Sequence, residues 1–184
     1  MSTRSTTRAV LPALFLLVAG PAAAPLAAQE GPELTDPQIA HVAVTANAID
    51  VELAELARDR AQSDDVKAFA QTMITDHTAV NERAAALAER LGVTPEDNDV
   101  SRSLRSEADS VRESLDDLGG RSFDRAYIRR EVDYHGAVLE ALDGLLIPQS
   151  DNAELKALLT EVRPAIAAHL EHAEQLAAEL SSQP

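Results

Sequence analysis

Apolar residues recur at steps of three and four along most of the chain, and such steps place them on one face of a helix. The first stripe covers about residues 36–60 and the second about residues 64–91, which ends at Gly92. A polar residue, His77, stands in the middle of the second stripe. The pattern predicts two long helices that pack along a shared apolar seam.

Three more helical segments follow. Residues 95–118 keep the helical period but are more polar, and stronger stripes cover about residues 123–147 and a final helix that opens at Asp151. A helix of about 20 residues spans about 30 Å, roughly the length of a bundle. The polar helix therefore has the length of a crossover. Residues 36–180 are predicted to form an all-α, antiparallel four-helix bundle with an extra crossover helix between the second and third core helices.

The start of the chain has the pattern of a secretory signal peptide. Arg4 and Arg8 precede an apolar run at residues 9–19, and small residues follow as far as Ala28. That run is too short to span a bilayer, which takes about 20 residues. We expect removal of residues 1–28 by cleavage after Ala24 or Ala28, with an uncleaved anchor as the alternative. Residues 29–35 are then a short lead-in and 181–184 a tail.

The cysteine content and the net charge exclude several kinds of covalent modification and several classes of binding partner. The chain has no cysteine, which excludes a lipidated cysteine, a disulfide and a thiolate ligand. The formal charge of −15 becomes −17 once the two arginines of the signal segment are removed. Such a chain repels nucleic acid and anionic lipid surfaces. We expect an exported, periplasmic protein. It should bind no nucleic acid and should not contact the membrane after signal cleavage. Its negative charge favours a cation or a basic envelope protein as partner.

Three histidines occupy core positions on three different predicted helices. They are His77, His135 and His169. Glu52 on the first helix, His77 and His135 lie close to one level of the bundle, and His169 lies about one turn away. These four residues are the candidates for a metal site or a buried polar core. A supporting role is expected for their neighbours, which are Asp76, Glu131, Tyr134 and His172.

Several short motifs resemble one exported helical family, domain of unknown function 4142 (DUF4142), which is grouped with the ferritin-like bundles. The motifs are Glu52 within residues 51–57, the run 73–77 that ends in His77, the run 123–127 with His135 after it, and residues 164–173 around His169. The resemblance spans about residues 36–180. It implies a ferritin-like four-helix bundle with a crossover helix, and it implies no established activity.

The sequence departs from the ligand pattern of ferritin-like di-iron sites. Those sites use Glu-x-x-His on two helices. The residues three positions before the histidines are Ile74, Val132 and Ile166. A ferroxidase centre is therefore not expected, and no strand–turn context for a nucleophile is present. These absences favour a non-catalytic function for the chain.

Three hypotheses use the same histidines. In the first, they form a structural polar core that sets the helix register of a non-catalytic envelope or stress-related module. In the alternative, His77, His135, His169 and Glu52 bind a transition metal (Fe, Zn, Cu or Mn) in a degenerate ferritin-like site. In the third, protonation of the histidines below about pH 6 loosens the core. A different class of function is also open, in which the Ala-rich amphipathic bundle binds apolar ligands or partner helices. The cofactor is unknown, and a transition-metal ion is the candidate.

Overall fold

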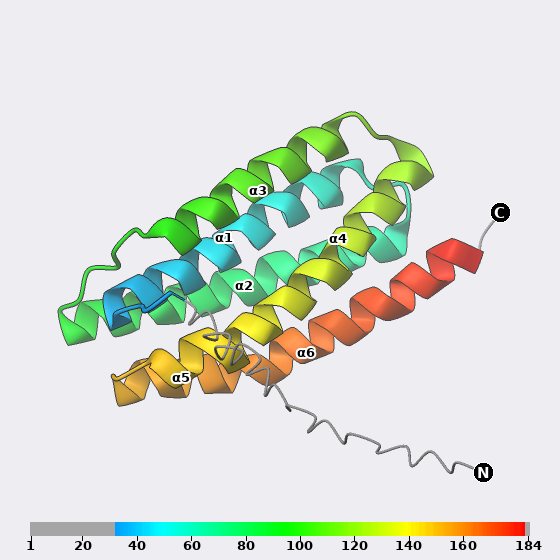
Figure 1. The fold of residues 1–184 in the computed structure, drawn as a ribbon. Coiled ribbons are helices and arrows are strands. Elements are labelled where there is room, and N and C mark those ends of the chain that lie inside the picture. The colour runs from blue at the N-terminus through cyan, green and yellow to red at the C-terminus, as the bar shows by residue number, and fades with distance from the viewer. Residues whose placement is uncertain (1–31, 183–184) are drawn as a thin grey trace, which may run out of the picture. The chain divides into compact units, whose positions relative to one another are not determined.

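The computed structural model describes residues 32–182, so the predicted signal peptide at residues 1–28 lies outside the described part. The described elements are α1 (Asp36–Arg60), α2 (Asp64–Leu91), α3 (Asp99–Asp116), α4 (Gly120–Ala141), η1 (Leu142–Leu146), α5 (Ile147–Gln149) and α6 (Ala153–Ser182) (Figure 1). Within residues 32–182, none of the helices combines the length and the hydropathy needed to cross a membrane.

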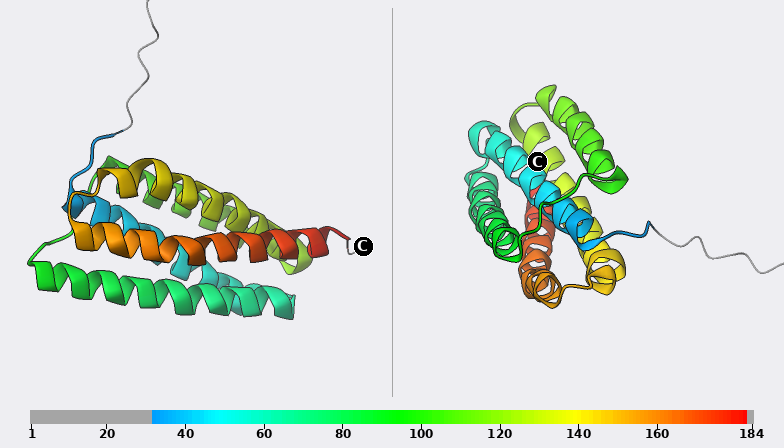
Figure 2. Two further views of the ribbon diagram at one scale, coloured as in Figure 1. Left: turned by 90° about the horizontal axis from the view of Figure 1, so that it is seen from below. Right: turned by 90° about the vertical axis from the view of Figure 1, so that its left-hand side faces the viewer.

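Four long helices form the bundle, and α3 lies outside them. Helices α1 and α2 form an antiparallel pair, as do α4 and α6 (Figures 1 and 2). Helix α3 packs against α1 and α4 and returns the chain to the end from which α2 started. Because of this return, α2 and α4 run in the same direction. The predicted all-α bundle with a crossover helix is confirmed.

The helix ends show where local chemistry decides the boundaries. Gly92 ends α2 with φ 64°, a left-handed conformation that glycine adopts without steric penalty. Helix α3 starts later than residue 95, at Asp99, because the Asn98 side chain accepts the N–H groups of the first turn. Helix α4 starts earlier than residue 123. Its buried Asp124 accepts the backbone N–H groups of Gln62 and Ser63 and so ties α4 to the α1–α2 turn.

The third core helix does not remain α-helical up to Pro148. A π-helical turn, η1, replaces its last part, and Pro148 lies in the short α5 that follows. The next helix is capped by Asn152 and not by Asp151, because the Asn152 side-chain oxygen accepts the N–H groups of Glu154 and Leu155.

The interior consists of two apolar clusters with a polar layer between them. The first cluster includes Leu53, Val66, Phe69, Met73, Phe123, Tyr127, Ile128, Ala173 and Leu176. The second cluster consists of Ile39, Val42, Leu87, Leu142, Leu146, Leu155, Leu159 and Ile166. The polar layer consists of the buried residues Asp50, His77, Glu131, His135 and His169. The bundle therefore places its chemistry at mid-length, where all four long helices meet.

Candidate metal centre

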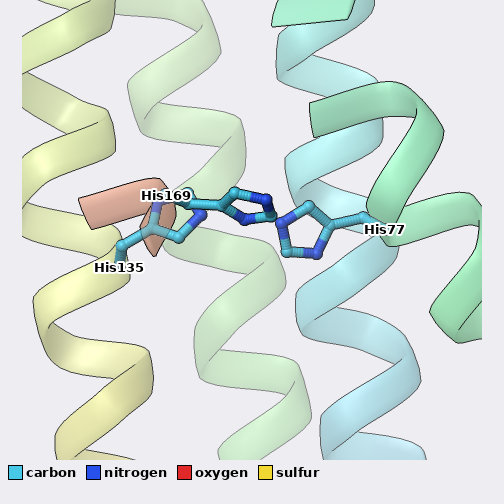
Figure 3. Close-up of side chains that lie close together, drawn as sticks. All are labelled: His77, His135 and His169. Carbon is cyan, nitrogen blue, oxygen red and sulfur yellow. The ribbon is translucent and has the colours of Figure 1, made fainter. Parts of the chain in front are cut away.

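The imidazoles of His77, His135 and His169 converge inside the bundle from α2, α4 and α6 (Figure 3). The ring centroids lie 5.7 Å apart for His77 and His135, 5.3 Å for His77 and His169, and 5.4 Å for His135 and His169. One ligand nitrogen from each ring lies within 4.8 Å of the other two. All three side chains are buried. The structure therefore brings the three sequence-predicted histidines together.

Each imidazole is bonded on its outer side to an acceptor. The three contacts are His77 Nδ1 with Asn47 Oδ1 (2.6 Å), His135 Nδ1 with the Glu131 carbonyl (3.0 Å) and His169 Nε2 with Asp76 Oδ2 (2.9 Å). An amide, peptide or carboxylate oxygen accepts a hydrogen bond and cannot donate one. The hydrogen of each neutral ring therefore lies on the bonded nitrogen, and the other nitrogen carries a lone pair.

The remaining ring nitrogens face the centre of the layer. These inner nitrogens are His77 Nε2, His135 Nε2 and His169 Nδ1, and all three are buried. Within residues 32–182 the inner nitrogens of His135 and His169 have no hydrogen-bond partner, whereas His77 Nε2 lies 2.8 Å from Asp50 Oδ2. A buried polar atom without a partner costs about 1–3 kcal/mol. The inner nitrogens of His135 and His169 are two such atoms, and they face the ion-paired ring of His77.

A carboxylate from α1 lies beside the three imidazoles. Asp50 is fully buried, and its Oδ2 lies 2.8 Å from His77 Nε2 and 3.7 Å from His135 Nε2. Burial alone raises the pKa of Asp50, but His77 and Arg130 outweigh burial and hold this pKa below its usual value. Two lone-pair atoms 2.8 Å apart repel unless a positive species, a proton or a metal ion, lies with them.

Glu52 does not join the layer, and Asp50 takes the expected place. The Glu52 carboxylate is exposed and pairs with Arg105 of α3 at 2.8 and 3.0 Å. Two residues along a helix turn the side chain by about 200°, so these two acids face opposite ways. The sequence does hold a signal for Asp50, because Leu53, Ala54 and Ala57 follow it at steps of three, four and seven.

Glu131 and Arg130 lie beside Asp50. Arg130 Nη1 lies 2.9 Å from Asp50 Oδ1 and 2.7 Å from Glu131 Oε1, and Glu131 Oε2 lies 3.4 Å from His135 Nδ1. Burial and the charge of Asp50 raise the pKa of Glu131 to about 8, against the opposing effect of Arg130. Tyr134 supports this group, because its ring lies 3.8 Å from the Arg130 guanidinium and its hydroxyl donates to the Ala46 carbonyl.

Of the other two expected neighbours, Asp76 contributes a hydrogen bond to the polar layer and His172 does not. Asp76 accepts from His169, as described above, and links α2 to α6. His172 is exposed and packs edge-on against Phe69, with ring centroids 5.2 Å apart. It therefore supplies no nitrogen to the layer. Asn47 was not anticipated, because an amide on a helix face carries no distinctive sequence signal.

Burial favours the neutral form of the His135 and His169 imidazoles. Burial lowers the pKa of His135 to about 4. Burial also lowers the pKa of His169, although the hydrogen bond to Asp76 opposes that shift. A neutral imidazole is the form that binds a metal ion, so no proton has to be displaced from these two inner nitrogens at neutral pH.

An apolar cavity of about 360 Å³ adjoins the layer on one side. It reaches from Asn47, which holds His77, to Asp36 and Asn152 near the end of the bundle. Six of its lining residues belong to the second apolar cluster, namely Leu87, Leu142, Leu146, Leu155, Leu159 and Ile166. The layer is thus bordered by open space on the side of the second cluster.

Comparison with known proteins places the chain in a family without an assigned activity. No curated protein matches it. A crystal structure of a DUF305 protein from Streptomyces coelicolor, named as a secreted protein, is similar in fold, with a TM-score of 0.67 and 14% identity. The match covers 79% of this chain and 93% of that one. The family model for the domain of unknown function DUF4142 matches residues 21–176, and the chain therefore belongs to the DUF4142 family.

Proposed function

We propose that this protein binds a divalent transition-metal ion between the four long helices. The ligands are the three inner nitrogens, from His77, His135 and His169, together with Asp50 Oδ2. The observation that carries the proposal is that each imidazole is bonded outward to an acceptor, while its inner nitrogen faces the other two rings. Outer acceptors of this kind orient histidine ligands in metal sites.

The donor set favours Zn²⁺ among the candidate metals. Imidazole ligands suit Zn, Cu, Fe and Ni, and a tetrahedral set of three nitrogens and one carboxylate oxygen is typical of Zn²⁺. Ligand atoms on a tetrahedral Zn²⁺ lie about 3.3 Å apart. The distances from Asp50 Oδ2 to the inner nitrogens of His77 and His135, 2.8 and 3.7 Å, bracket that value. Fe, Cu and Mn remain the competing ions.

Four protein ligands leave a four-coordinate ion without an open position. A closed site is typical of structural metals, whereas catalytic sites keep one position for water or substrate. The proposed ligands come from α1, α2, α4 and α6, so the ion would join all four long helices. This supports a metal-stabilised or metal-holding protein more than a metalloenzyme.

The structural polar core is the competing hypothesis. In that case a proton on His77 Nε2, and not a metal ion, lies between the ring and Asp50. The outer bonds of the layer would then serve only to set the helix register. The two hypotheses make different predictions. The metal site predicts stoichiometric metal in the purified protein and loss of metal binding when one imidazole is removed. The polar core predicts a metal-free protein that only loses stability when one imidazole is removed.

The test is metal analysis of untagged protein and of two histidine variants. Wild-type protein equilibrated with Zn²⁺ should retain stoichiometric metal after dialysis. His77→Ala should bind it more weakly by over about 100-fold, since it loses a ligand. His172→Ala is the matched control and should bind as wild type, because its ring lies outside the layer. Wild-type protein that stays metal-free with Zn²⁺, Fe²⁺, Cu²⁺ and Mn²⁺ would establish the polar core instead.

We also propose that the chain is exported. The support is the basic start, the apolar run at residues 9–19 and the small residues up to Ala28. N-terminal sequencing of protein from a secreting host should give a chain that begins at Pro25 or Gln29. A chain that keeps Met1 and stays in the membrane fraction would show an uncleaved anchor.

A further inference from the structure

The polar layer contains a second group of ligand atoms beside the proposed metal centre. Asp50, Glu131 and His135 each offer one atom within 4.8 Å of the other two. Asp50 and His135 also border the first centre, so the two groups share an edge. Glu131 is fully buried, and its Oε2 lies 3.4 Å from His135 Nδ1.

The Asp50 carboxylate faces two different cation positions. Its Oδ2 lies beside the inner nitrogens of His77 and His135, whereas its Oδ1 lies 2.9 Å from Arg130 Nη1. A carboxylate that bridges two metal ions has the same division, with one oxygen on each ion. Here a guanidinium occupies the second position.

Arg130 is held firmly in that position. Its Nη1 contacts the carboxylates of Asp50 and Glu131 at 2.9 and 2.7 Å, and the ring of Tyr134 covers its guanidinium at 3.8 Å. The Arg130 side chain is only 11% exposed. Its charge balances one of the two buried carboxylates, as a metal ion would.

We propose that Arg130 is a built-in cation that takes the place of a second metal ion, so that the bundle holds one metal ion and not a pair. The inference rests on the proposed function, because it presumes that the first position binds a metal. Two-metal chemistry needs ions about 3.5–4 Å apart. The Arg130 guanidinium excludes this arrangement by its charge and by occupying the Asp50 and Glu131 oxygens.

A merely structural role for Arg130 makes a different prediction. An arginine that only pairs with buried acids would, when removed, leave a less stable protein with unchanged metal stoichiometry. An arginine that stands in for a metal would, when removed, leave two carboxylates that can bind a second ion. Metal stoichiometry therefore separates the two roles, and stability alone does not.

The experiment compares Arg130→Met with Arg129→Met, its exposed neighbour in α4. Co²⁺ is the probe, because it binds nitrogen and oxygen ligands, and bound ions are counted by calorimetry and metal analysis. We expect one equivalent in wild type and in R129M, and a second, weaker equivalent in R130M. Arg130→Lys, which keeps the positive charge, should return the stoichiometry to one.

Each result decides the question. One equivalent in both wild type and R130M would overturn the role of Arg130 and leave the metal centre intact. No Co²⁺ in wild type or in R129M would overturn the proposed function itself. If R130M is unfolded without metal, its circular dichroism should recover the helical signal on addition of excess Co²⁺, and failure to recover would count against the proposal.

Discussion

The two apolar clusters on either side of the polar layer are packed differently. In the first cluster Phe69, Phe123 and Tyr127 are 0% exposed, and Phe123 and Tyr127 stack with ring centroids 6.4 Å apart. In the second cluster Leu87 and Leu155 retain 9% and 7% exposure, and the cluster borders the 360 Å³ cavity. The first cluster contains aromatic rings, whereas the second consists only of aliphatic side chains.

This difference in packing indicates that the two clusters support the polar layer unequally. The first cluster packs fully buried aromatic side chains on one side of the layer, and close packing resists displacement. The second cluster adjoins open space, and the π-helical turn η1 lies within it. We expect the layer to be fixed from the first side and approachable from the second.

The largest effect is expected in the first cluster. Phe69→Ala should lower the free energy of unfolding by about 4 kcal/mol, because the removed ring leaves a cavity among neighbours that cannot close around it. Urea unfolding of metal-free protein, followed by circular dichroism, measures this loss. A loss below about 2 kcal/mol would show that the first cluster is able to relax.

A smaller loss is expected in the second cluster. Leu142 is buried but lines the cavity, so part of its surface already lacks neighbours. Leu142→Ala should therefore lower the free energy of unfolding by about 2 kcal/mol, the lower end for leucine in a core. The measurement is the same urea titration. A loss equal to that of Phe69→Ala would contradict the difference between the clusters.

The layer between the clusters should respond to pH through His135. Its pKa in the folded protein is about 4, below the ordinary value of 6.5, so the folded state binds fewer protons than the unfolded state. Stability from the neutral ring is complete above pH 6.5 and is lost as pH falls toward 4. Between pH 7.5 and pH 5 the loss is about 2 kcal/mol.

His135→Gln isolates this contribution. Glu131, with its pKa raised to about 8, regains stability as pH falls and so opposes His135, but it is present in both proteins. The difference in unfolding free energy between metal-free wild type and H135Q should therefore shrink by about 2 kcal/mol from pH 7.5 to pH 5. A difference that is constant with pH would mean that folding does not shift the pKa of His135.

The smallest expected effect is an increase in the free energy of unfolding when the cavity beside the second cluster is partly filled. Ala84 of α2 lines the cavity, whereas Ala86, two residues later, is exposed. Ala84→Leu should raise the free energy of unfolding by about 1 kcal/mol, because the added carbons are partly removed from water. Ala86→Leu is the control and should change stability by less than about 0.5 kcal/mol. Equal effects of the two variants would show that the cavity is not filled.

The periodicity of the sequence was sufficient to predict the bundle and the three histidines that meet in it. A polar residue at a stripe position is forced to the helix face that packs, so His77, His135 and His169 all had to point inward. Their distances from the helix midpoints placed His77 and His135 at one level and His169 about one turn away. These features are local to each helix or depend only on helix lengths, and both can be read from one sequence.

The tertiary structure decided between the acids that could complete the layer, because the periodic signal for Asp50 is weak beside an acid two residues later. Asp50 and Glu52 are both acids on α1, and the choice between them depends on how that helix is rotated between α2 and α3. Because α3 covers one side of α1, Glu52 pairs with Arg105 of α3 and Asp50 turns to the histidines. The placement of Arg130 on the Asp50 and Glu131 carboxylates depends likewise on how α1 and α4 pack, and helix rotation and packing are properties of the assembled bundle.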